Sequence, residues 1–163
     1  LAKEAGVPAA TIPTATPRAA ERFPVHEFAA KDLSGRTWGL ADLKGKVALV
    51  NIWTTWCGPC RAEMPGLQKL FERWKDRKDR VVLTISADAH ADLARAFVQE
   101  HGYQFPVIHG QDVAAKFFPP VYFPQNWLID PTGRRLNNRP PPPGDSTLDQ
   151  IEELANQAAK QAP

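Results

Sequence analysis

Two different spacings of apolar residues meet near residue 57. Residues 47–53 form a short apolar run rich in β-branched and aromatic side chains, which predicts a strand buried on both faces. Beyond it, apolar residues recur every three or four positions, which predicts an amphipathic helix over residues 57–75. These residues are Met64, Leu67, Leu70, Phe71 and Trp74. The pattern therefore predicts a strand that leads directly into a helix.

The same reading predicts the other elements. Strands are expected at 80–86 and 105–108, hairpins at 23–40 and 126–136, and helices at 88–101, 112–118 and from Ser146 onward. The turns of the hairpins are predicted at 33–36 and 130–133, and Gly102 is expected to end a helix. Leu93, Ala96 and Phe97 are expected to face inward, as are Leu148, Ile151 and Leu154. Strands separated by helices, followed by a late hairpin, predict an α/β fold with a mixed central sheet flanked by helices.

Composition separates a leader from a domain. Residues 1–22 are rich in Ala, Pro and Thr without periodicity, which predicts a flexible linker or simply a frayed terminus, and residues 23–163 are expected to form one domain. Because the chain begins at Leu1 and not at methionine, we expect that an upstream segment was removed, and a signal peptide or a membrane anchor would both fit such a segment. A net charge of +2 is too small to indicate a nucleic-acid partner.

Both cysteines of the chain lie where the predicted strand meets the predicted helix, in Cys57-Gly58-Pro59-Cys60. The unpaired N–H groups and the macrodipole of a helix start stabilise a thiolate, and can lower a cysteine pKa from about 8.5 to roughly 3.5–7.5. Cys57 is therefore the expected nucleophile, with Cys60 one turn further along. Pro59 fits the first turn of a helix, where no hydrogen bond is lost.

Two other readings of the cysteine pair remain. Cys-x-x-Cys is also a metal-ligand spacing, although no second pair of ligands follows it at a suitable distance. A purely structural disulfide would close a loop of two residues and remove little entropy from the unfolded chain. The helix-start position favours a redox role.

These residues resemble a known family. Trp56-Cys57-Gly58-Pro59-Cys60 is similar to the active-site pentapeptide of thioredoxins, and Pro65 falls where thioredoxins carry a helix-bending proline. Three features resemble the TlpA/ResA/CcmG-like extracytoplasmic branch. They are Asn51 in place of a buried aspartate, Glu63 in Cys-x-x-Glu-x-Pro, and Phe123-Pro124 leading into Trp127-Leu-Ile-Asp130. The likeness extends over residues 23–139.

The resemblance implies a thioredoxin fold with an N-terminal β-hairpin extension, and it implies roles for several residues. Glu63 is expected to be a partly buried carboxylate that raises the thiol pKa values and exchanges a proton with Cys60; the alternative is an exposed helix glutamate. Pro124 is expected to follow a cis bond, with Phe123 against the disulfide. Trp56 is expected to dock partners or shield the disulfide. Asn51 is expected to be a satisfied buried polar group, and Trp53, Trp74 and Trp127 are expected in the core.

The predicted function is that of a thiol-disulfide oxidoreductase outside the cytoplasm, acting as a reductant without a cofactor. The resemblance implies disulfide-containing client proteins, such as apocytochrome c or a copper-site assembly protein, and a membrane thiol carrier as electron donor. The protein is expected to be a monomer. A copper-binding chaperone that uses the two thiols as ligands is the alternative. A peroxiredoxin-type peroxidase is disfavoured, because the proline of Pro-x-x-x-Thr-x-x-Cys is missing before Cys57.

Overall fold

The computed structural model describes residues 24–117, 122–136 and 145–161. Its centre is a four-stranded mixed sheet in the order β5-β4-β3-β6. The strands are β3 (Val47–Trp53), β4 (Arg80–Ser86), β5 (Val107–His109) and β6 (Gln125–Ile129). β3 runs parallel to β4 and antiparallel to β6, and β5 runs parallel to β4. The α/β class and the mixed sheet are as predicted.

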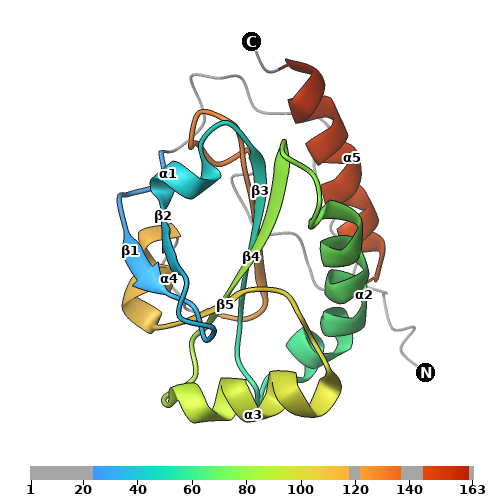
Figure 1. The fold of residues 1–163 in the computed structure, drawn as a ribbon. Helices are drawn as coiled ribbons and strands as arrows, with labels where there is room; N and C mark the ends of the chain where they lie inside the picture. The colour runs from blue at the N-terminus through green and yellow to red at the C-terminus, as the bar shows by residue number, and fades with distance from the viewer. Residues whose placement is uncertain (1–23, 118–121, 137–144, 162–163) are drawn as a thin grey trace, which may run out of the picture.

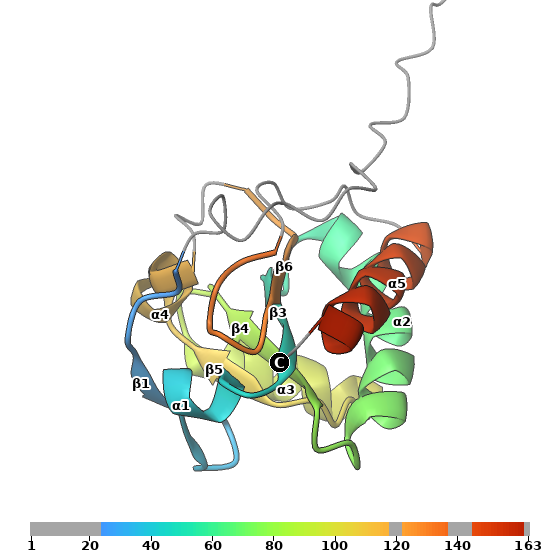
Figure 2. The same cartoon turned by 90° about the horizontal axis from the view of Figure 1, so that it is seen from above.

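Helices cover both faces of this sheet (Figures 1 and 2). One face carries α2 (Gly58–Trp74), α3 (Ala91–His101) and α5 (Asp145–Gln161), which bury the first of two hydrophobic clusters. The other carries α1 (Leu40–Leu43), α4 (Gln111–Phe117) and a separate hairpin of β1 (Ala29–Lys31) and β2 (Thr37–Gly39), which bury the second. The site described below is built on the α2 face.

β3 contributes to both clusters because successive strand residues point to opposite faces. Val47, Leu49 and Trp53 belong to the α2 cluster, while Ala48, Val50 and Ile52 belong to the other. All seven residues of β3 are buried, as the continuous apolar run predicts. Because of this alternation, Asn51 points toward α2. Asn126, which lies opposite Asn51 in the antiparallel β3–β6 pair, points to the same face.

Residue 66 is where α5 packs against α2. Gly66 is inside α2, and a Cβ at this position would come within 2.6 Å of Leu148 Cδ1 of α5. Leu148 and Ile151 are buried, whereas Leu154 is half-buried. α5 begins at Asp145, one residue before the predicted start at Ser146. The predicted inward stripe is therefore confirmed for its first two members and holds in part for the third.

α3 differs from its prediction in its start and in its buried face. It begins at Ala91, three residues later than the predicted residue 88. Ala94 and Phe97 are buried, but Leu93 is 48% exposed and Ala96 is also exposed. The inward placement of Leu93 and Ala96 was therefore wrong, because periodicity in a short helix does not fix which of two adjacent stripes meets the sheet. Gly102 ends the helix with φ 68°, as predicted.

The two turns lie where the sequence places them. β1 and β2 pair antiparallel with Ala30 opposite Trp38, and Gly35 supplies the positive φ of the turn. After β6, the Asp130 carboxylate accepts the backbone N–H of Thr132 and Arg134, and the returning chain forms a bridge between Arg135 and Ile129. No helix in the described residues is both long enough and apolar enough to cross a membrane. The predicted linker over residues 1–22 lies outside the described residues.

Candidate active site

The two cysteines form a disulfide at the start of α2. Cys57 is the N-cap residue and Cys60 lies in the first turn, with Cα atoms 5.3 Å apart. The Cys60 backbone N–H, which has no carbonyl partner within the helix, donates to Cys57 Sγ over 3.2 Å. Cys57 is 6% exposed, whereas Cys60 is fully buried. Cys57 is therefore the more accessible of the two sulfurs, and its role as the nucleophile stays a prediction.

The residues between and after the cysteines shape the helix start. Gly58 and Pro59 are exposed and begin α2, and Pro59 loses nothing there because its position has no intrahelical N–H partner. Pro65 lies inside α2 with its ring exposed. The predicted helix start at the two cysteines and the predicted place of Pro65 within the helix are both found in the structure.

An aromatic pair stands beside the disulfide. Trp56 is 71% exposed, and its ring meets that of the half-buried Phe123 edge-on, with centroids 5.8 Å apart. The Phe123–Pro124 peptide bond is cis, as the resemblance implies, and Pro124 is buried. Trp53, Trp74 and Trp127 are buried in the core, as predicted. Trp56 and Phe123 thus form an aromatic pair next to Cys57, and their contact with a docking partner stays a prediction.

Behind the disulfide, three polar side chains from three elements form a buried cluster. Glu63 of α2 is 2% exposed, and Asn51 of β3 and Asn126 of β6 are equally buried. Asn51 Nδ2 donates to Glu63 Oε2 over 3.3 Å and to Asn126 Oδ1 over 2.8 Å. Asn126 Nδ2 donates to Glu63 Oε1. Each carboxyl oxygen of Glu63 therefore faces one amide N–H group.

The environment of Glu63 raises its pKa to about 7. Burial is the largest cause, because it penalises the charged carboxylate, and the hydrogen bonds from Asn126 and Asn51 oppose it. Glu63 follows Cys60 by three residues on the same helix, so both buried side chains lie on its inner face. A carboxyl group that titrates near neutral pH beside a buried thiol is suited to exchanging a proton with it. The alternative of an exposed helix glutamate is excluded.

Asn51 is only partly satisfied, contrary to the prediction. Its Nδ2 makes two hydrogen bonds, but its Oδ1 has no partner among the described residues. A buried oxygen without a partner lowers the stability of the fold, while the same amide makes two hydrogen bonds through Nδ2, to Glu63 and to Asn126.

Sequence reasoning missed two residues of this region. Asn126 lies opposite Asn51 in the β3–β6 register, a pairing that is not readable from the sequence. Asp88 is buried after β4, where its carboxylate accepts Thr55 N and Thr55 Oγ1, and Ser86 Oγ. It thereby fixes the loop that leads from β3 to Cys57. An aspartate two residues after the end of an apolar strand was the available signal.

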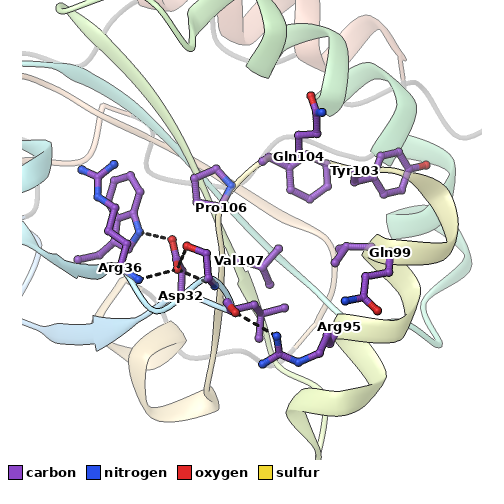
Figure 3. A pocket seen from close by; sticks show the side chains of 13 residues that line it. Asp32, Arg36, Arg95, Gln99, Tyr103, Gln104, Pro106 and Val107 are labelled. Carbon is purple, nitrogen blue, oxygen red and sulfur yellow. Dashed lines mark hydrogen bonds between the residues drawn. The ribbon is translucent and has the colours of Figure 1, made fainter.

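A hollow of about 410 Å³ lies between the β1–β2 hairpin, α3 and the start of β5 (Figure 3). At its floor the Asp32 carboxylate accepts Ser34 and Arg36 backbone N–H groups and Trp38 Nε1–H. Arg95 Nη1 donates to Leu33 O across the hollow. These polar groups hold the hairpin against the sheet. None of the residues that line the hollow belongs to the disulfide site.

In the part of the chain that the structure describes, His, Cys, Asp and Glu side chains do not gather in groups of three or more that could hold a metal ion.

Comparison with known proteins gives consistent relatives. The model of the AhpC/TSA family matches residues 22–134. The thioredoxin-like protein YneN of Bacillus subtilis is 33% identical over 108 residues, which are 66% of this chain and 64% of YneN. The thiol-disulfide oxidoreductase ResA of Bacillus thuringiensis subsp. konkukian is 32% identical over 127 residues, 77% of this chain and 71% of ResA. The structure of a secreted thiol-disulfide isomerase from Corynebacterium glutamicum has a TM-score of 0.72 and 25% identity, covering 87% of this chain and 91% of that one.

Proposed function

Because the chain belongs to the AhpC/TSA family and to the ResA-type thiol-disulfide oxidoreductases, we propose that it reduces disulfides of client proteins outside the cytoplasm. The observation that carries this proposal is the Cys57–Cys60 disulfide at the start of α2, with the buried Glu63 carboxyl on the same helix. The pair can pass between dithiol and disulfide without a cofactor.

The reaction starts from the reduced pair. Cys57 thiolate attacks one sulfur of the client disulfide, and the other client sulfur leaves as a thiolate that takes up a proton. Cys60 then gives its proton to the Glu63 carboxylate and attacks Cys57 Sγ in the mixed disulfide. The bond between Cys57 and the client breaks, so the client is reduced by two electrons and the Cys57–Cys60 disulfide forms. Glu63 can return its proton to the departing client sulfur.

Glu63 also supports a reducing direction. A disulfide is a strong oxidant when the reduced form of the pair is stabilised as a thiolate. In this chain the helix start stabilises the Cys57 thiolate, but an ionised carboxylate on the same helix repels it. This repulsion destabilises the reduced form and lowers the reduction potential. The protein would thus donate electrons, and a membrane thiol carrier would regenerate it.

The surface around Cys57 supports a protein client rather than a small thiol. Trp56 and Phe123 offer an aromatic platform next to the accessible sulfur. The family resemblance implies that the backbone before Pro124 offers hydrogen-bonding groups to an extended segment of the client. Clients of cytochrome c maturation or copper-site assembly fit this description. The Ala/Pro/Thr-rich composition of residues 1–22 and the name of the secreted relative support a place outside the cytoplasm.

The proposal is tested by reduction of insulin with dithiothreitol as electron donor, together with the reduction potential measured against glutathione. The wild type is expected to accelerate insulin reduction, and Cys57→Ser to abolish the acceleration. Cys60→Ser is expected to accumulate a mixed disulfide through Cys57. Metal content of the reduced protein is measured in parallel. Bound copper without insulin reduction would favour the copper-chaperone alternative and overturn the proposal.

A further inference from the structure

Asn126 occupies an unusual position next to the site. It lies on β6, two residues after Pro124, and faces Asn51 across the antiparallel β3–β6 pair. Its amide is 1% exposed and bridges two other buried polar groups, since Oδ1 accepts from Asn51 and Nδ2 donates to Glu63. β3, β6 and α2 thus each contribute one polar side chain to a closed triangle of hydrogen bonds inside the protein.

The hydrogen bond from Asn51 determines how the Asn126 amide is oriented. Asn51 Nδ2 donates to Asn126 Oδ1 over 2.8 Å, so the oxygen side of the Asn126 amide faces β3. The NH₂ side is then directed to Glu63 Oε1. If the Asn126 amide were reversed, two NH₂ groups would face each other and no donor would reach that oxygen.

This arrangement suits a carboxylate and not a carboxylic acid. Both oxygens of Glu63 face donors, and a carboxylate accepts at both. A protonated carboxyl would have to direct its O–H at an amide NH₂ group, which accepts nothing. Because burial acts in the opposite direction and favours the neutral acid, the two amides decide how readily Glu63 ionises.

The charged surroundings of Glu63 are sparse. Among the described residues, no lysine, arginine or histidine forms an ion pair with it, and its shift has no contribution from another charged group. From β3 and β6 it is faced by the two neutral amides. On α2, the titratable groups near it are the thiols at Cys57 and Cys60 in the reduced protein. The amides are therefore the main opposition to burial.

We propose that Asn126 is a positioning residue that, oriented by Asn51, holds the Glu63 carboxyl ionised and aimed along the inner face of α2, so that it can accept the Cys60 proton. This inference rests on the proposed function for its role in the reaction, but not for its effect on Glu63. When Cys60 gives up its proton, Glu63 becomes neutral while Cys60 becomes the attacking thiolate. The amide N–H groups then favour return of that proton to the leaving client sulfur.

The test follows the protonation of Glu63 directly, in the oxidised protein, by the ¹³C chemical shift of the side-chain carboxyl as pH is varied. Glu63→Gln identifies the signal by removing it. In the wild type the midpoint is expected near the value of about 7 that burial and the two amides set together. Asn126→Leu keeps the side-chain volume and removes the donor, so the midpoint should rise by about one to two units.

Thr84→Val is the matched control. Thr84 is equally buried in the same sheet and accepts from Trp53 Nε1, but it makes no hydrogen bond to Glu63. It should therefore leave the midpoint unchanged. Asn126→Ala is made alongside, so that a folded variant without the donor is at hand if leucine disturbs the strand. An unchanged midpoint in a folded Asn126 variant overturns the proposal.

The role in the reaction is read from the rate at which a preformed mixed disulfide at Cys57 is resolved. Asn126→Leu should be slow near neutral pH and recover as pH rises, whereas Glu63→Gln should be slow throughout. In the Glu63→Gln background, Asn126→Leu should add no further loss. An equal loss in both backgrounds contradicts action through Glu63. If the wild type resolves no mixed disulfide at all, the proposed function fails, and the carboxyl titration still decides the effect on Glu63.

Discussion

A single buried carboxyl group, Glu63, combines most of the electrostatic consequences of this site. Burial raises its pKa from 4.5 to about 7, and the amide hydrogen bonds keep the rise from being larger. Because the folded protein keeps the Glu63 proton at pH values where the unfolded chain has already released it, the free energy of unfolding falls as pH rises from 4.5 to about 7. Glu63, which the proposed mechanism uses as the proton acceptor, therefore makes the fold less stable at pH values above this window than below it.

Glu63→Gln should reveal this cost as a pH-dependent gain in stability. Below 4.5 the glutamate is protonated in both states; between 4.5 and about 7 the folded protein keeps a proton that the unfolded chain has released. The free energy of unfolding of the wild type thus falls as pH rises through this window, by roughly 3 kcal/mol in total. Urea titrations at several pH values should show the advantage of Glu63→Gln growing by that amount. Glu100→Gln, an exposed change on α3, is the control. A constant difference between Glu63→Gln and the wild type contradicts the assignment.

How far a residue's role could be predicted depended on whether it stands in the motif. Cys57, Cys60 and Glu63 are spaced three residues apart at the start of α2, with Cys57 as its N-cap, so spacing alone places them together. Asn126 comes from a strand 63 positions away from Glu63, and it meets Glu63 only through the β3–β6 register. A contact that depends on register between distant strands is not visible in periodicity. For the same reason, the sequence could not show that Asn51 Oδ1 has no hydrogen-bond partner among the described residues, and a satisfied amide was expected instead.

At the scale of elements, α3 shows how two stripes compete in a short helix. Leu93, Ala96 and Phe97 form one apolar face, which the sequence favoured, and Ala94, Phe97 and Val98 form an overlapping one. In the structure Phe97 packs on Trp53, with ring centroids 5.5 Å apart, and this contact rotates Leu93 to the surface. A large aromatic side chain buries more apolar area than leucine, so its docking decides the rotation of the helix.

This orientation of α3 predicts unequal effects of two alanine substitutions. Phe97→Ala should lower the free energy of unfolding by about 3–5 kcal/mol, because it leaves a cavity beside Trp53. Leu93→Ala removes a half-exposed side chain and should cost no more than about 0.5 kcal/mol. Chemical denaturation of both variants, monitored by tryptophan fluorescence and circular dichroism, measures the difference. Equal losses would mean that α3 presents the predicted face after all.

Considered as a whole, the molecule separates its chemistry from its extension by the central sheet. α2, which carries Cys60 and Glu63, lies on one face of the sheet, and β1 lies on the other side with α1 and α4 (Figure 2). This architecture followed from the sequence because strand and helix signals alternate clearly between residues 47 and 117, and both turn motifs are specific. What the sequence did not supply was the packing between distant elements, which depends on side-chain shape: the Gly66–Leu148 contact of α2 with α5, and the attachment of the hairpin.

That attachment depends on Asp32, and it predicts that stability and redox activity can be separated. Asp32 accepts hydrogen bonds from Ser34, Arg36 and Trp38, and its backbone bridges β1 to Ile108 at the sheet edge. Asp32→Ala leaves several donors unpaired and should lower the free energy of unfolding by about 2 kcal/mol. Since the hairpin lies across the sheet from Cys57, the rate of insulin reduction below the unfolding transition should stay at the wild-type value. Exposed Lys31→Ala, one residue away, should change neither quantity. A parallel loss of insulin reduction in the folded Asp32→Ala protein would show instead that the hairpin extends its influence through the sheet to the disulfide.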